Sequence, residues 1–384
     1  MKFLSKYLLF ILLLANMTSE YILFAPISEV LFYGVLAISI PVLFQFGFLP
    51  KGSYAKAPEI CILIFTYLFA QFVLQTDLLT LPNILYTVSK VVIFCILIMC
   101  IGRNFDFYLK KAPEILSFSI LAIVSLGWFY NTYTGEFHHL TFGFVNRNTA
   151  CTIATAGFAG FIFMRERLRM IDYLAAAVLF ITVLYGGSRN AMVMCILIVM
   201  VKYGFSFKLI TASLILFLFI IYVLPMMGIE ATAWERVIGT IDGSVDVDRE
   251  TVREIAWRMI KVRPLTGWGY RYEILPSIAA EMKTNLNGHN GYLVTIENLG
   301  WPCGLLALSC IVIGSIKSLR LYLLKNRYIN FHLSIVVSTI FAANQESYFI
   351  GVNQFTTNMF FMSFVVLGMA RYIRKRKNNL NVCG

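Results

Sequence analysis

A histidine and two arginines lie where the sequence changes from apolar to polar, and these residue types can carry acid–base chemistry and bind anions. His289, followed by Asn290, precedes an apolar stretch, and a neutral imidazole there can accept a proton from a hydroxyl group. Arg189 lies between two apolar runs, and its guanidinium can bind a phosphate through two hydrogen bonds. Arg147 occupies a similar position. The alternative is structural: a histidine satisfied by a backbone carbonyl, and arginines that reach lipid headgroups.

The segment before His289 adds a further arginine beside an aromatic residue. Arg253 and Trp257 are four residues apart on a predicted helix, so their side chains share one face. Arg249 is the alternative phosphate ligand, and ordinary surface helices also carry such pairs. Polar residues within or beside apolar runs are costly to expose to lipid, so they predict a water-filled cavity at one end of the protein. They are Asn148, Asn290, Glu297, Asn344, Glu346, Asn353, Gln354 and Asn358.

The candidate metal ligands have simpler explanations. Asp246 and Asp248 form a D-x-D pattern that can hold a divalent ion on a diphosphate, but Asp248 also suits a helix cap. His138 and His139 form a second candidate acid–base pair, which the polarity of a loop explains equally well. Every cysteine except Cys383 lies in an apolar stretch, and no C-x-x-C spacing occurs. We therefore predict neither a disulfide framework nor a metal site nor another cofactor.

The composition indicates that most of the chain is embedded in lipid. Of the residues 59% are hydrophobic and 14% charged, and the mean hydropathy is +0.76. One water-soluble core cannot bury that much apolar surface. The apolar runs predict an all-α bundle of about twelve transmembrane helices, the first of them retained rather than cleaved as a signal peptide. The runs are 7–24, 30–48, 60–74, 84–101, 115–130, 150–164, 171–185, 191–201, 209–225, 291–316, 331–343 and 350–370.

The basic residues predict the orientation of this bundle. When the loops are numbered alternately, 21 of the 32 basic residues fall on one side, which the positive-inside rule assigns to the cytoplasm. Both termini then lie in the cytoplasm, and the net charge of +12 reflects orientation rather than nucleic-acid binding. The residues are Lys2, Lys6, Lys51, Lys56, Arg103, Lys110, Lys111, Arg165, Arg167, Arg169, Lys202, Lys208, Lys317, Arg320, Lys325, Arg327, Arg371, Arg374, Lys375, Arg376 and Lys377.

Three regions follow from this topology. Residues 1–225 form the first nine transmembrane helices, residues 226–290 form one long outer loop, and residues 291–384 form the last three helices and a basic tail. The pattern of the long loop predicts an amphipathic helix that ends before Pro264. We therefore expect the loop to form a folded cap. Its apolar stripe consists of Val252, Ile255, Ala256, Met259 and Ile260. In the helix after the loop, Gly300 and Gly304 favour close helix packing.

This layout resembles the O-antigen ligase and polymerase superfamily, whose members are integral-membrane glycosyltransferases that use undecaprenyl-diphosphate-linked glycans. The resemblance covers most of the chain and rests on an ordered series of residues. They are Asn148 after a Phe- and Gly-rich loop, Ser188-Arg189, Arg253-x-x-x-Trp257, Pro264-x-x-Gly267-x-Gly269, and His289-Asn290 with nine residues before Gly300. The chain departs from the family pattern at Cys303, where a glycine is usual, and Gly304 follows.

The resemblance implies a metal-independent, inverting transfer on the periplasmic face of the bacterial inner membrane. His289 would deprotonate the acceptor hydroxyl, while Arg189 and Arg253 would neutralise the departing diphosphate. The implied donor is an undecaprenyl-diphosphate-linked glycan, and the acceptor is the lipid A core, for a ligase, or a lipid-linked glycan, for a polymerase. The single long outer loop favours the ligase. A lipid-glycan flippase or transporter and a non-catalytic envelope-assembly protein are the alternatives from other classes.

Overall fold

The computed structural model describes residues 2–47, 52–134, 141–204, 247–270, 275–278 and 290–382, together with residues 211 and 215. Within these ranges the chain is helical and forms no strand, and Tyr21 and Phe144 make an isolated bridge. The predicted all-α class is therefore confirmed for the described part of the chain. The predicted span 209–225 lies almost entirely outside the described residues, and all the other predicted spans coincide with helices.

The long elements follow the apolar runs of the sequence. They are α1 (Lys2–Ser19), α2 (Ser28–Phe46), α4 (Pro58–Phe69), α5 (Leu81–Arg103), α6 (Phe105–Thr134), α7 (Arg147–Met164), α8 (Met170–Gly186), α9 (Arg189–Tyr203), α13 (Val247–Val262), α15 (Gly291–Leu319), α16 (Arg327–Ala342) and α17 (Phe355–Val382). Short elements join them: η1 (Ile22–Ile27), α3 (Ser53–Lys56), the π-helical turn η2 (Ala70–Leu74), η3 (Thr76–Leu78) and η5 (Arg320–Leu324).

Four helices of the described part are long and apolar enough to cross a membrane. They are Ser28–Phe46, Leu81–Arg103, Phe105–Tyr133 and Gly291–Leu324, and Leu4–Ser19, Pro58–Leu74 and Met170–Gly186 are shorter apolar helices. α5 and α17 lie inside the bundle, whereas α2 and α8 expose large apolar side chains such as Val30 and Met170. Such exposed apolar faces suit contact with lipid rather than water. The full count of twelve spans stays a prediction.

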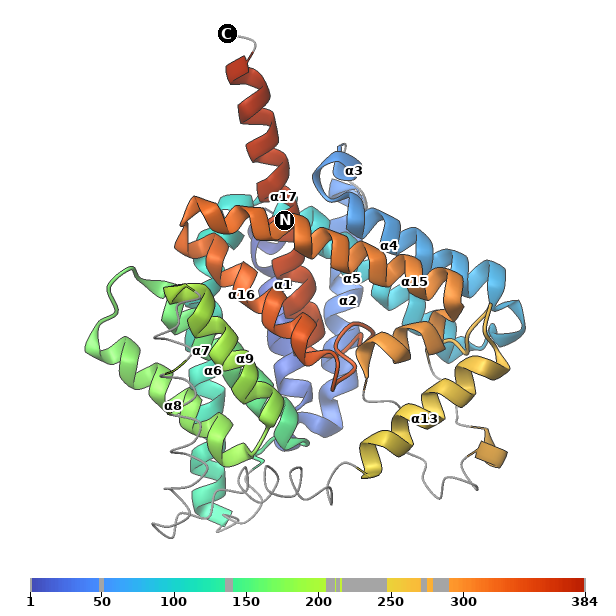
Figure 1. Cartoon of the computed structure of the whole chain (residues 1–384), viewed down its shortest axis with the longest axis horizontal. Coiled ribbons are helices and arrows are strands. Elements are labelled where there is room, and N and C mark those ends of the chain that lie inside the picture. Colours follow the sequence, from blue (N-terminus) through green and yellow to red (C-terminus); the bar gives the residue numbers. More distant parts are fainter. Residues whose placement is uncertain are drawn as a thin grey trace.

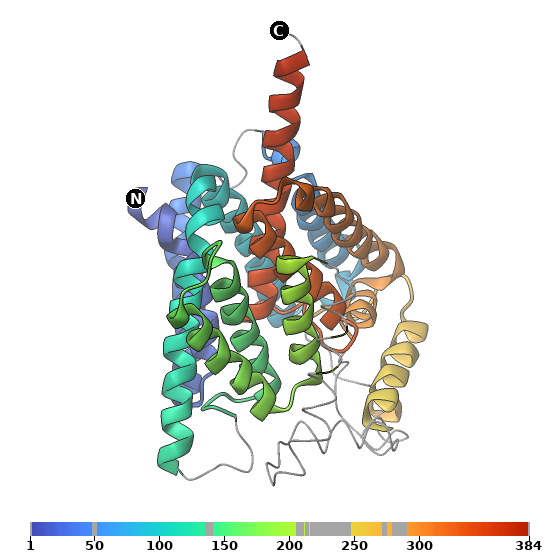
Figure 2. The ribbon, with the colours of Figure 1, turned by 60° about the vertical axis from the view of Figure 1, so that its left-hand side comes forward.

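The two ends of the bundle differ in what they carry. α17, which ends in the basic tail, projects from one end, and the N-terminus lies towards that same end (Figure 1). The amphipathic helix α13 lies towards the opposite end, and the view turned by 60° agrees (Figure 2). This arrangement fits the predicted placement of both termini on one side and the cap on the other.

α13 packs its predicted apolar stripe into the protein. Val252, Ile255, Ala256, Met259 and Ile260 are all buried, so the amphipathic helix and its buried face were predicted correctly. Ile260 joins the main core, while Ile255 and Met259 form a smaller cluster with Ile278.

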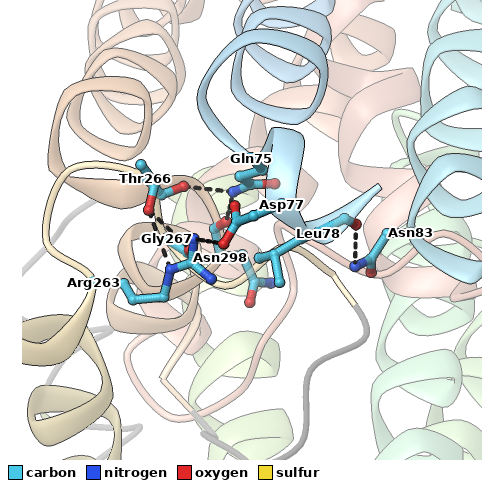
Figure 3. A network of polar contacts seen from close by, with 8 residues as sticks. All are labelled: Gln75, Asp77, Leu78, Asn83, Arg263, Thr266, Gly267 and Asn298. Carbon is cyan, nitrogen blue, oxygen red and sulfur yellow. Dashed lines mark hydrogen bonds and ion pairs between the residues drawn. The ribbon is translucent and has the colours of Figure 1, made fainter. Parts of the chain in front are cut away.

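The turn that follows α13 docks onto a kink in α15. Gly300 has a φ of 73°, which interrupts the helix, and Pro302 has no N–H to donate to the carbonyl four residues earlier. That carbonyl belongs to Asn298, and it accepts hydrogen bonds from Gly269 N at 3.0 Å and from Gln75 Nε2 at 2.6 Å instead. Figure 3 shows the network around this carbonyl. The kink thus exposes an acceptor that holds both the turn and the segment after α4.

Two more backbone hydrogen bonds complete the docking. Trp268 N donates to Glu297 O at 3.0 Å, and Trp301 N donates to Pro264 O at 2.7 Å. Without the kink, Trp301 N would donate to Glu297 O within the helix. The turn therefore replaces hydrogen bonds that the kink removes from α15.

The glycines of this contact allow the two backbones to touch. Gly267 and Gly300 have φ values of 69° and 73°, a region that side chains with a Cβ rarely adopt. A Cβ on Gly267 would collide with Gly300 N, and a Cβ on Gly300 would collide with Leu265 O. The prediction that Gly300 serves packing between helices is therefore wrong. A Cβ on Gly304 would lie 2.8 Å from Cα of Ile296, in the other half of the same helix.

Arg263 fastens the end of α13 to the segment after α4. Its Nη2 lies 2.6 Å from Asp77 Oδ2, and its Nε donates to Thr266 Oγ1 at 3.3 Å (Figure 3). Its guanidinium also lies 5.2 Å from the Trp268 ring. Because the turn, α15 and the segment after α4 share these contacts, the cap helix is held in one place against the bundle.

Candidate functional site

The first residues of α15 are tied to the segment 343–348, which follows α16. The Asn290 side chain caps α15 by accepting hydrogen bonds from the N–H groups of Tyr292 at 3.0 Å and Leu293 at 3.1 Å. Its Nδ2 donates to O and Oδ1 of Asn344, at 2.9 and 3.1 Å. Gly291 N donates to Ala343 O at 2.8 Å. Asn290 is thus fully engaged and fixes where the chain enters α15.

The first residues of α7 reach the same segment. Asn148 Nδ2 donates to Glu346 Oε1 at 3.3 Å. One turn later, the Thr152 hydroxyl lies 2.9 Å from the Tyr348 hydroxyl. Asn148 and Asn290 are separated by 142 positions in the chain, yet both contact residues 344–346. We call this group, Asn148, Asn290, Asn344, Glu346 and Tyr348, the polar junction.

Glu20, at the end of α1, lies beside this polar junction. Burial raises the pKa of Glu20 to about 7. Burial, together with the charges of Glu346 and Glu20, also raises the pKa of Tyr348. Val145 N donates to Glu20 O at 2.8 Å, which holds the end of α1 next to the start of α7. The predicted span 7–24 includes Glu20, whereas α1 ends at Ser19, so Glu20 lies just beyond the membrane-spanning helix.

Lys90 anchors the next part of the same loop from inside the bundle. This side chain is fully buried in α5, and its ammonium donates to the carbonyls of Phe349, Ile350 and Gly351 at 3.3, 3.2 and 2.9 Å. The three donors of an ammonium are thereby matched to three acceptors. The Phe361 ring centroid lies 4.8 Å away. Residues 349–351 are therefore held by a buried cation directly after the polar junction.

The remaining polar residues of the α17 region pack against α1. The prediction starts a helix at residue 350, whereas α17 begins at Phe355, so Asn353 and Gln354 precede the helix. Asn16 Nδ2 donates to Asn353 Oδ1 at 2.7 Å, and Asn358 Nδ2 donates to Asn16 Oδ1 at 2.8 Å. The Asn16 side chain thus links Asn353 and Asn358.

Arg147 and Arg189 are the first residues of α7 and α9, respectively. Ser188 caps α9 by accepting from Ala191 N at 3.4 Å, and Gly187 ends α8 with a φ of 69°. The turn between α8 and α9 lies close to the start of α7. A Cβ built on Gly186 would be only 3.9 Å from Arg147 O. Two half-buried arginines therefore begin two neighbouring helices whose N-terminal dipoles favour anions.

Arg253 and Trp257, predicted to share one face of a helix, both lie on α13. Trp257 is 42% exposed, and its ring centroid lies 6.0 Å from that of Trp301 in α15. The cation–π contacts found among the described residues join other pairs, so Arg253 does not lie over Trp257. Arg253 is half-buried on the same helix, and Arg249 belongs to its first turn. The predicted roles of both arginines in binding phosphate stay predictions.

Several candidates fall outside the described residues. They are His289, His138, His139 and Asp246. Glu297, predicted to line a cavity, is 1% exposed and lies in the first segment of α15, where its carbonyl receives the docked turn. Among the described residues, no three His, Cys, Asp or Glu side chains form a group that could hold a metal ion.

The fold and the polar junction define a helical membrane protein with a cluster of hydrogen-bonded polar groups at the end of the bundle that carries α13. Residues 174–308 match the family model described as O-antigen ligase. The resemblance to the O-antigen ligase and polymerase superfamily is thereby confirmed. The matched segment includes Arg189, Arg253 and His289 but ends before residues 343–351. The family consists of glycosyltransferase-type enzymes, which supports an enzymatic function. No curated protein matches the chain at a significant level.

Proposed function

We propose that the protein is an O-antigen ligase that moves a polysaccharide from undecaprenyl diphosphate to the lipid A core. The observation that carries the proposal is the convergence of Asn148 and Asn290 on residues 344–346, because it joins the matched domain to a second part of the chain at one polar site. The single long outer loop of the sequence favours the ligase over the polymerase reaction.

The reaction requires a base and a cationic site for the leaving group. The acceptor hydroxyl oxygen attacks the anomeric carbon, and His289, the residue that covalently precedes Asn290, takes its proton. The bond from the anomeric carbon to the diphosphate oxygen breaks, and the polyprenyl diphosphate leaves with the electron pair. Attack opposite to the leaving group inverts the anomeric configuration.

The cations proposed for the diphosphate are Arg189 and Arg253, with Arg147 in a weaker role and Arg249 as the substitute for Arg253. Support comes from Arg147 and Arg189, which begin adjacent helices and therefore add guanidinium charge to two helix dipoles. Preorganised cations at the departing charge can supply much of the rate without a metal ion.

The proposed orientation places this site in the periplasm. Both termini and the basic loops then lie in the cytoplasm, and the chain belongs to the bacterial inner membrane. A phosphatase reporter fused after Gly243 should be active in the periplasm, and one fused after Lys377 should be inactive. Activity of both fusions, or of neither, would contradict the orientation.

Deletion of the protein tests the reaction itself. A ligase deletion should leave long glycan on the polyprenyl carrier and a bare lipid A core, which gel separation of lipopolysaccharide and extraction of carrier-linked glycan would detect. Core capped with a single repeat would identify a polymerase instead. An unchanged lipopolysaccharide ladder would contradict both reactions, and glycan retained on the inner leaflet would favour a flippase or transporter.

A further inference from the structure

A basic pocket lies at the end of the bundle opposite the polar junction. Its volume is about 400 Å³. It is lined by Phe163, Glu166, Lys202, Tyr203, Tyr322, Leu323, Lys325, Arg327 and Asn330. These residues come from the end of α7, the end of α9, η5 and the start of α16.

Contacts with the chain ends locate this pocket at the end of the bundle that carries the basic tail. Arg374 Nη1, near the end of α17, donates to Arg320 O in η5 at 3.4 Å. Tyr108 in α6 donates to Lys6 O near the N-terminus at 2.7 Å, and it lies beside His332 of α16. The predicted orientation makes this the cytoplasmic end of the bundle.

The pocket carries an excess of positive charge with hydrogen-bond donors to spare. Among the described residues, Lys202, Lys325 and Arg327 form no salt bridge. The Lys202 ammonium spends one donor on Arg165 O at 3.1 Å, and Arg327 spends Nη2 on the Tyr328 hydroxyl at 2.7 Å. An ammonium has three N–H donors and a guanidinium five, so most of these donors remain available.

The cations are held close together although their charges repel. Burial lowers the pKa of Lys202, the charge of Arg327 lowers it further, and Glu166 on the exposed rim raises it. Three cations against one carboxylate leave a local excess of two positive charges. Asn330, which is 9% exposed, adds a buried amide whose Oδ1 has no hydrogen-bond partner. Because Oδ1 is an acceptor, it suits a hydroxyl or ammonium donor of a headgroup, whereas the unused N–H donors of the cations suit the phosphate.

The pocket wall favours a lipid over a free ion. Leu323 is 77% exposed and Tyr203 is 55% exposed, and both line the pocket beside the cations. Apolar and aromatic side chains next to basic groups at a helix end suit acyl chains below a headgroup. We propose that this pocket binds the headgroup phosphate of an anionic phospholipid in the cytoplasmic leaflet. The proposal does not depend on the transferase reaction.

Binding can be measured on the purified full chain in detergent after removal of native lipid. Phosphatidylglycerol should raise the melting temperature in a saturable manner, and phosphatidylcholine should not. The variant K325Q/R327Q should weaken phosphatidylglycerol binding by about tenfold or more for each cation, the cost of a charge-assisted hydrogen bond. The single variant K325Q changes an exposed side chain and serves if the double variant does not fold.

The matched control is K375Q/R376Q, which removes two exposed charges from the basic tail at the same end. It should bind phosphatidylglycerol as the unaltered chain does. Equal weakening in this control would assign the effect to general surface charge and overturn the proposal. Inorganic phosphate that binds with the same affinity as phosphatidylglycerol would identify a free anion as the ligand, and equal shifts with phosphatidylcholine would exclude headgroup recognition.

Discussion

The docking of the turn on α15 can be tested by replacing Gly267 with alanine. Two effects combine in this variant. The φ of 69° costs about 1–2 kcal/mol for a residue with a Cβ. The added Cβ also collides with Gly300 N, so the turn has to move away from the kink. Three backbone hydrogen bonds then break, donated by Trp268, Gly269 and Trp301. These hydrogen bonds contribute about 1 kcal/mol each, so the free energy of unfolding of G267A should fall by roughly 4–5 kcal/mol in all.

A second glycine separates the two effects. Gly47 has a φ of 86°, and nothing lies within 4 Å of a Cβ built on it. At the φ of 86° and ψ of 135° of Gly47, G47A should therefore lose only the conformational term, about 1–3 kcal/mol. The free energy of unfolding can be measured by denaturant titration of the purified protein in mixed micelles, with tryptophan fluorescence as the signal. Equal losses in G267A and G47A would refute the view that backbone contact, rather than backbone conformation, requires Gly267.

Three further variants test the site. Burial favours the protonated form of Glu20 in the native state, so the free energy of unfolding should fall as the pH rises from 4.5 to about 7. E20Q should remove this pH dependence and be more stable than the unaltered chain at pH 8 by up to about 3 kcal/mol, as thermal melts at each pH would show. N290A loses a helix cap and the bonds to Asn344, so the free energy of unfolding should fall by about 1–3 kcal/mol in denaturant titration; no loss would mean that the junction is not structural. R189K keeps the charge but loses the forked geometry, so transfer should fall by about ten- to a hundredfold, measured as the ratio of capped to bare lipid A core. R167K, in an exposed loop, is its control, and equal activity of both variants would contradict a phosphate-binding role for Arg189.

Helix positions were predictable because apolar runs of sufficient length leave few alternatives in a membrane. The start of α6 was not predicted, since this helix begins at Phe105 rather than at residue 115. The early part contains Lys110, Lys111 and Glu114, which resemble a loop by charge, yet Lys111 and Glu114 pair at 2.7 Å on the surface of a continuous helix. Charge excludes a segment from lipid without ending a helix.

The polar junction was only partly predictable. Its individual residues were recognised as polar groups that lipid disfavours, but a single sequence does not indicate that Asn148 and Glu346 meet across 198 positions. The kink in α15 had a local signal, because Gly300 and Pro302 lie two residues apart within one apolar run. The partner of that kink, the turn 264–269, could not be identified from local sequence because its contacts are between backbones.

Lys90 has a consequence for the order in which the protein is assembled in the membrane. The helix that carries it is synthesised long before its acceptors, since 259 positions separate Lys90 from Phe349. Until residues 349–351 are inserted, α5 holds an ammonium without its partners in an apolar surrounding, at a cost of about 3 kcal/mol at the centre of a bilayer. Early intermediates of membrane insertion therefore carry an ammonium whose hydrogen-bond acceptors arrive only with the segment between the last two helices. The bundle should become fully stable only when synthesis of the chain is nearly complete, and chains truncated before residue 349 should be substrates for membrane proteases.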